Sequence, residues 1–167
     1  MATAALRNLT ASNVGVVAKD MVSLGAVRPL LLVFNEGTEQ AQEHAAGVIL
    51  NLAACHVGRN RIMDTPGASA AVVAMLRSPD SGTRERAAGT ITNLGAMPQY
   101  QIVLAKEGAI PLLVQLLEEG SHRGREEAAV ALSNLAINRQ NQLVTTYHSL
   151  GTTRLQSLPW RQWVNPF

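Results

Sequence analysis

AAGTITNL, at residues 87–94, is the stretch of sequence that decides the fold. Close copies stand at 45–52 (AAGVILNL) and 128–135 (AAVALSNL), and a shortened copy ends at Leu9. The asparagines of the four copies are 43, 42 and 41 residues apart, at Asn8, Asn51, Asn93 and Asn134. Four glycines are 42, 41 and 43 residues apart, at Gly25, Gly67, Gly108 and Gly151. Two independent landmarks with one period indicate a repeat protein.

Each repeat is expected to contain three helices, with the quoted stretch in the third. The fourth unit is the clearest, because it has a turn at Gly108, a break around Gly120, and Pro111 early in its second helix, where the missing N–H costs least. The helices expected in the third and fourth units cover 59–65, 70–76 and 83–96, and then 101–106, 110–117 and 125–137. In the second unit, a first helix is poorly defined around 14–24, and Pro29 lies early in the second helix.

The fourth unit carries a resemblance to a known family. KEGAIPLLVQLLEEG at 106–120, followed by REEAAVALSNLA at 125–136, resembles the armadillo repeat of importin-alpha, beta-catenin and the vacuolar armadillo proteins. HEAT repeats have a similar period but lack both the Gly-Ala-Ile-Pro turn and the Asn-Leu ending. The resemblance implies an all-α, right-handed solenoid over residues 1–142. Its units are a partial one at 1–11 and full ones at about 13–55, 58–97 and 99–138.

The composition changes after Gln142. Residues 147–167 contain four of the six aromatic residues, and Glu127 is the last acidic residue of the chain. Gly151 nevertheless keeps the repeat register. Residues 143–167 are therefore interpreted as a degenerate fifth unit or a divergent tail, and a gene-model artefact is a further alternative.

The composition suits a helical repeat protein and argues against several other classes. Apolar residues make up 47% of the chain and aromatic residues only 4%, which suits thin helical layers. The net charge is +2, and no run of like charge reaches five residues, so nucleic-acid binding is not expected. With a single cysteine, Cys55, no intramolecular disulfide can form. No apolar stretch approaches the roughly 20 residues that a membrane helix needs. We expect a cytoplasmic or nuclear protein without membrane insertion.

No catalytic or cofactor-binding pattern is present. The sequence lacks a phosphate-binding glycine loop, an HExxH pair and a CxxC pair. The four histidines have no cysteine or carboxylate at metal-ligand spacing. We therefore predict no enzymatic activity, no cofactor and no metal.

The third helix of each unit carries the candidate binding residues. Counted from the asparagine, apolar residues at −6, −2 and +1 form one helical stripe, which is expected to face the core. Positions −7, −4 and 0 form another stripe, expected to line a concave surface. Its members are His44, Gly47 and Asn51; Arg86, Gly89 and Asn93; and Glu127, Val130 and Asn134.

The asparagines of this second stripe are predicted to form a ladder. A carboxamide can both donate to and accept from an extended peptide backbone. In armadillo proteins that bind extended peptides the matching asparagines do this, and the resemblance implies that Asn51, Asn93 and Asn134 do so here. His44, Arg86 and Glu127 would tune the choice of ligand. The alternative is that the asparagines bond within the array and stabilise it.

Two glycines and two departures from the family refine this prediction. Gly47 and Gly89 lower helix propensity by roughly 1 kcal/mol each, which either a close ligand backbone or tight helix packing would explain. The tryptophan that import adaptors place one turn before each asparagine is absent, which argues against binding of nuclear-localisation peptides by that mechanism. There is also no row of groove-lining basic residues for an acidic ligand.

Three glutamates recur one position before this stripe, at Glu43, Glu85 and Glu126. They are interpreted as first-turn residues that favour the helix dipole, not as a row of acids for a basic ligand.

The function predicted from the sequence is a non-enzymatic scaffold that binds a protein or an extended peptide. The alternatives are the substrate-recognition part of an armadillo-containing ubiquitin ligase and a structural segment of a longer array. A membrane-tethered scaffold is a weaker alternative, because the acylation signal is absent. Because a stack that begins within a repeat exposes an apolar end, self-association through the repeat ends is also expected.

Overall fold

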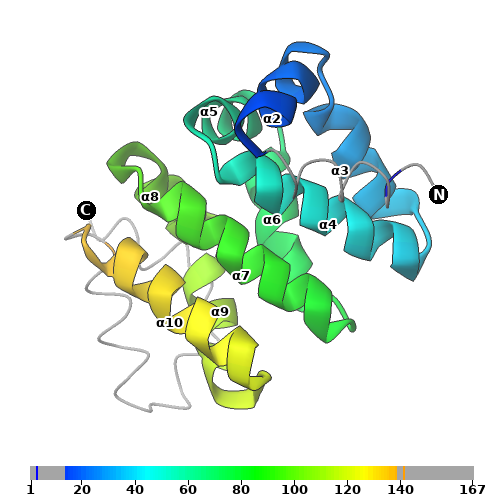
Figure 1. Cartoon of the computed structure of the whole chain (residues 1–167). Helices are drawn as coiled ribbons and strands as arrows, with labels where there is room; N and C mark the ends of the chain where they lie inside the picture. Colours follow the sequence, from blue (N-terminus) through cyan, green and yellow to red (C-terminus); the bar gives the residue numbers. More distant parts are fainter. Residues whose placement is uncertain (1–2, 4–13, 139–140, 142–167) are drawn as a thin grey trace.

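The computed structural model describes Thr3, residues 14–138 and Asn141 (Figure 1). Apart from Thr3, the partial unit expected at 1–11 lies outside the described residues, as does the tail at 143–167; Asn8 and Gly151 are among the residues not described.

Within the described residues the chain consists of helices arranged as three successive triplets, and it contains no strand. The first triplet is α2 (Val14–Ser23), α3 (Val27–Glu36) and α4 (Glu39–Ala53). The second is α5 (His56–Asp64), α6 (Ala68–Ala74), the 3₁₀ turn η1 (Met75–Arg77) and α7 (Ser81–Gly95). The third is α8 (Pro98–Lys106), α9 (Ala109–Glu119) and α10 (His122–Ala136).

The repeating glycines lie between the first and second helices of the triplets. Gly25, Gly67 and Gly108 have φ angles of +75°, +78° and +88°, a conformation that L side chains rarely adopt. The requirement for positive φ explains why glycine recurs at these three turns.

A side-chain cap starts each third helix. Thr38, Asp80 and Ser121 accept hydrogen bonds from the backbone N–H three residues later, at 3.3, 2.6 and 2.9 Å. Burial raises the pKa of Asp80, but hydrogen bonds from Thr83 and Gly82 and the charge of Arg86 outweigh it and hold that pKa below its usual value. These caps place the starts of α7 and α10 at Ser81 and His122, two to three residues before the predicted 83 and 125.

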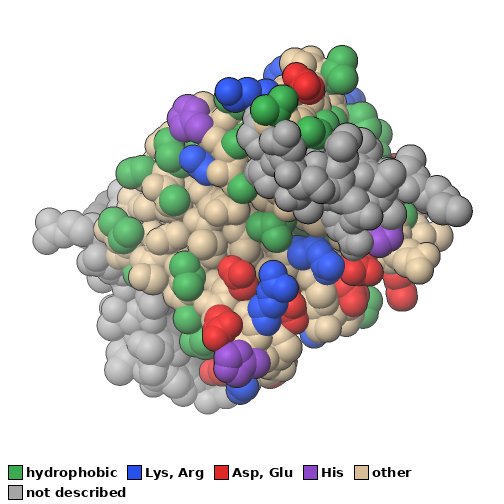
Figure 2. All heavy atoms as spheres, in the orientation of Figure 1, with side chains coloured by type: hydrophobic (Ala, Val, Ile, Leu, Met, Phe, Trp, Pro, Cys, Tyr) green, Lys and Arg blue, Asp and Glu red, His purple; other side chains and the backbone are tan. Residues whose placement is uncertain are grey.

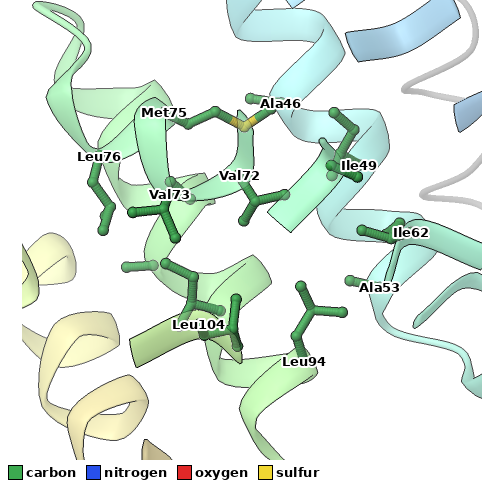
Figure 3. Packing of buried hydrophobic residues seen from close by; sticks show 14 of the residues in the cluster. Ala46, Ile49, Ala53, Ile62, Val72, Val73, Met75, Leu76, Leu94 and Leu104 are labelled. Carbon is green, nitrogen blue, oxygen red and sulfur yellow. The ribbon is translucent and has the colours of Figure 1, made fainter. Parts of the chain in front are cut away.

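The third helices α4, α7 and α10 lie side by side on one side of the molecule, with α3, α6 and α9 behind them (Figure 1). The stripe at −6, −2 and +1 packs into the interior as predicted, although Leu132 is only half-buried. Its fully buried members are Ala45, Ile49, Leu52, Ala87, Ile91, Leu94, Ala128 and Leu135. Figure 3 shows Ile49, Val72, Leu94 and Leu104 pointing into this apolar interior from four helices.

Polar side chains join successive triplets at the ends of the third helices. The Arg59 guanidinium donates to the carbonyls of Ala53 and Ala54, both at 3.1 Å. The Gln101 amide donates to the Gly95 carbonyl at 2.9 Å. The Asn141 amide donates to the carbonyls of Leu135 at 3.0 Å and Gln101 at 3.1 Å. A residue shortly after each third helix thus hydrogen-bonds carbonyls at the helix end that would otherwise lack an intrahelical partner.

Candidate partner-binding surface

The predicted site residues lie on α4, α7 and α10, and we call the surface that these helices form the third-helix face. Acidic and basic side chains gather over the part of it formed by α7 and α10 (Figures 1 and 2). Asn51, Asn93 and Asn134 are all half-buried near the C-terminal ends of their helices. Their surroundings differ from one helix to the next.

Asn134 is bonded within the array. Its side-chain amide donates to the Thr92 carbonyl of α7 at 3.0 Å. In return, the Thr92 hydroxyl donates to the Glu127 carbonyl of α10 at 3.4 Å. The two bonds run in opposite directions between α7 and α10, so Asn134 makes a bond within the array, as the alternative to ligand binding expects.

Asn93 differs from the other two asparagines. Its carboxamide is half-buried and has no hydrogen-bond partner among the described residues. Asn51 is engaged in a further interaction, as is His44. The three asparagines are therefore not equivalent, and Asn93 is the member of the predicted ladder whose donor and acceptor are both available.

The glycines of the stripe are buried, not open to a ligand. A Cβ atom on Gly89 would lie 3.1 Å from Leu50 Cδ1 and 3.4 Å from Glu127 Oε2. Those atoms belong to the helices on either side of α7, so tight packing between helices explains Gly89. Gly47 is also buried on α4. The stripe at −7, −4 and 0 is consequently interrupted by packed positions and is not a continuous open surface.

Arg86 is held by an ion pair between units. Its guanidinium contacts the Glu43 carboxylate of α4 at 2.9 Å, with the two side chains 25% and 32% exposed. It also lies near Asp80, whose pKa it helps to lower. Arg86 is therefore part of the interface between α4 and α7, and its charge is already balanced.

The interpretation of the three recurring glutamates as first-turn residues is wrong. Because the helices begin earlier than predicted, Glu43, Glu85 and Glu126 are each the fifth residue of their helix. They instead contact neighbouring side chains. Glu43 pairs with Arg86, and Glu85 accepts a hydrogen bond of 2.6 Å from Ser121, the cap of α10. Glu126 lies 3.4 Å from His122 on an exposed surface.

Glu127 and Val130 complete the third-helix face on α10. The Glu127 side chain is half-buried against Gly89, and its carboxylate has no ion-pair partner among the described residues. Val130, one turn further along, is 49% exposed. Together with Asn93 they place an acid, an apolar surface and an unbonded carboxamide where α7 meets α10.

The part of the chain that the structure describes contains no group of three His, Cys, Asp or Glu side chains able to hold a metal ion. It also contains no single helix long and apolar enough to cross a membrane, although α8 and α9, bent by 82° at their junction, meet that criterion as a pair.

Comparison with known sequences points to one repeat family. The Armadillo/beta-catenin-like repeat matches residues 97–137. U-box domain-containing protein 4 of Arabidopsis thaliana is 42% identical over 60 residues, which are 36% of this chain and 7% of that protein. Catenin beta of Urechis caupo is 31% identical over 116 residues, which are 69% of this chain and 14% of that protein. The chain spans less than a fifth of the length of such curated relatives.

Solved structures agree over most of the chain. A designed armadillo repeat protein superposes with a TM-score of 0.77 at 24% identity, over 88% of this chain and 63% of the other. A designed armadillo repeat protein in complex with peptide (KR)4 superposes with a TM-score of 0.74 at 22% identity, over 96% and 72%. At this level of identity the likeness shows the fold alone, and the predicted all-α solenoid is confirmed.

Proposed function

This chain is an armadillo-repeat protein, and from that premise we propose that it is a non-enzymatic scaffold binding an extended segment of a partner protein across the third-helix face. The observation that carries the proposal is the half-buried carboxamide of Asn93, which has no partner among the described residues. Because neither end of this carboxamide is bonded within the described residues, a ligand can bond to both, at a net gain of about 0.5–1.5 kcal/mol for each hydrogen bond. An extended backbone offers the N–H and C=O that match the two ends of a carboxamide.

The related fold supports this reading. The solved designed armadillo protein that carries peptide (KR)4 shares the fold over 96% of the present chain. On the present chain Asn134 is engaged by Thr92 and Arg86 by Glu43, so both contribute mainly to the stability of the array. The proposed contact to ligand backbone therefore centres on Asn93 and the adjacent surface of α10.

The test is selection of binders from a library of random linear peptides on the full chain, followed by fluorescence anisotropy of a selected peptide. We expect Asn93→Ala to weaken binding by about tenfold, as for loss of one or two hydrogen bonds, without lowering the melting temperature.

Gln99→Ala is the matched control, because Gln99 is an exposed carboxamide on α8, which is not one of the third helices. It should leave affinity unchanged. Equal affinity of the wild type and the Asn93→Ala variant would contradict the proposal.

A second candidate function is recognition of substrates within a ubiquitin ligase. It is favoured by the matches to U-box domain-containing proteins 4 and 16, the second of which is 30% identical over 70% of this chain. In that case this chain would be the recognition part of a longer protein, and the same face would bind the substrate. Sequencing full-length transcripts of the gene would test this, because a U-box in the same reading frame is then required.

A further inference from the structure

A pocket lies on the other side of α7 from the third-helix face, where η1 and the start of α7 meet α9. Its volume of about 480 Å³ is within the roughly 300–1,000 Å³ typical of ligand pockets. Arg84, which lines it, is nine residues before Asn93 on α7. Nine residues are about two and a half helical turns, so the two side chains leave the helix on opposite sides. The proposed function therefore makes no use of this pocket.

Arg84 is held in a fixed orientation at the pocket. Its Nη1 donates to the Ser78 carbonyl at 2.6 Å and to the Pro79 carbonyl at 2.8 Å. The guanidinium has no further partner among the described residues, so its Nε and Nη2 groups are available to a ligand. A guanidinium that is already oriented loses little freedom on binding, and its planar fork matches a carboxylate in a bidentate pair.

Arg77 adds a second positive charge to the pocket. It is the last residue of η1, is exposed, and forms no ion pair within the part of the chain that the structure describes. Glu119 of α9 also lines the pocket, but it is exposed and accepts a 3.0 Å hydrogen bond from Gln115 of the same helix. Two guanidinium groups and one carboxylate leave the pocket with an excess of positive charge.

Three leucines contribute aliphatic surface to the same pocket. Leu76 and Leu116 are 4% and 5% exposed, and Leu112 is half-buried. A ligand here meets aliphatic carbon as well as positive charge. A free inorganic anion would use only the charge, whereas a peptide with an acidic and an aliphatic side chain would use both.

The pair of arginines is a feature of this unit and not of the repeat. Counted from the asparagine of the third helix, Arg77 and Arg84 are at positions −16 and −9. The corresponding residues are Asn35 and Gln42 in the unit before, and Glu118 and Arg125 in the unit after. Packing that is common to the units therefore does not require the pair.

We propose that this pocket binds an aspartate or glutamate in a linear segment of a partner protein, with Arg84 as the bidentate partner of the carboxylate and Arg77 as the second charge. Leu112 contacts an aliphatic residue beside that acid. The inference does not rest on the proposed function, because the residues that carry it lie on the other side of α7.

The experiment selects peptides from a random linear library on the full chain carrying Asn93→Ala, which removes the contact proposed for the third-helix face. We expect enrichment of aspartate or glutamate next to leucine, isoleucine, valine or methionine. The enrichment should disappear when Arg77→Glu is added. Fluorescence anisotropy of a selected acidic peptide should then show binding weakened by roughly tenfold in Arg84→Gln and by about threefold in Arg77→Gln, with smaller differences at high salt.

Arg125→Gln is the matched control. Arg125 is at the same position of the next third helix, is exposed, and does not line the pocket. Its replacement should leave the affinity within about twofold of the wild type. Circular dichroism melting checks that each variant folds. Arg77 is exposed and forms no ion pair among the described residues, so Arg77→Gln tests the pocket even if Arg84→Gln destabilises the chain.

The outcomes separate this pocket from the third-helix face. The proposal is wrong if the Asn93→Ala chain enriches no acidic residue, or if Arg77→Gln and Arg84→Gln both bind the selected peptide as tightly as the wild type. Displacement of the peptide by an equal concentration of inorganic phosphate would also overturn it, because the site would then be one for anions in general. Failure of Asn93→Ala to weaken peptides selected on the wild type would contradict the proposed function alone.

Discussion

The interface between α4 and α7 and the interface between α7 and α10 join equivalent helices of successive units, yet different groups hold them. In the first, an ion pair links Arg86 to Glu43. In the second, neutral hydrogen bonds link Asn134 to the Thr92 carbonyl and Thr92 to the Glu127 carbonyl. The apolar stripe beneath is nearly the same in both. The repeat thus keeps its apolar packing along the array, while the polar side chains above it differ from one junction to the next.

The largest effect is expected from filling the space that both interfaces share. Gly89→Val would push branched methyl groups against Leu50 of α4 and Glu127 of α10, so we expect a loss of about 2 kcal/mol in the free energy of unfolding. Urea denaturation measures it. Gly89→Ala is the control, since a helix-propensity gain of up to about 1 kcal/mol offsets a small shift of the Leu50 methyl. A Val variant as stable as the wild type would mean that α4 and α10 can move apart freely.

A smaller effect is expected from the neutral interface alone. Asn134→Ala removes the hydrogen bond to Thr92 and should lower the free energy of unfolding by about 1 kcal/mol, equally at low and high salt. Asn93→Ala, at the equivalent position of α7, should stay within about 0.5 kcal/mol of the wild type. Comparable losses in the two variants would show that the asparagines are equivalent after all.

The smallest effect is expected from the charged interface. Arg86→Met keeps most of the aliphatic stem but removes the charge, so we expect a loss of about 0.5 kcal/mol at low salt that disappears near 1 M salt. Urea melts across a series of sodium chloride concentrations measure it. Arg125→Met, at an exposed position of α10, should have no effect. A destabilisation that persists at high salt would assign the role of Arg86 to packing and not to charge.

The fold was largely predictable because its signals repeat. The period, the glycine turns and the buried face of each third helix all follow from residues that recur in every unit, such as Gly67 and Ile91. The starts of α7 and α10 were missed by two to three residues, because the polar residues Asp80 and Ser121 were placed outside the expected helices. In the structure these residues cap the helices from their first turn.

It was harder to predict which site residues are bonded within the array, because their partners lie one repeat away in the sequence. Nothing near Asn134 in the sequence indicates that it donates to Thr92, 42 residues earlier, or that Arg86 pairs with Glu43, 43 residues earlier. A signal does exist once the repeats are aligned. Seven residues before the asparagine, successive units have His44, Arg86 and Glu127. This change of charge from unit to unit indicates that the junctions differ.

The hydrogen bonds from Arg59, Gln101 and Asn141 to the ends of the preceding third helices affect how the array can be divided and recombined. Each unit ends on carbonyls whose donor belongs to its successor. A crossover placed between two repeats would separate a helix end from the side chain that bonds it. A crossover placed within a first helix, beyond the donor, would keep the two together. The segment best suited to duplication or exchange is therefore offset from the sequence repeat by several residues.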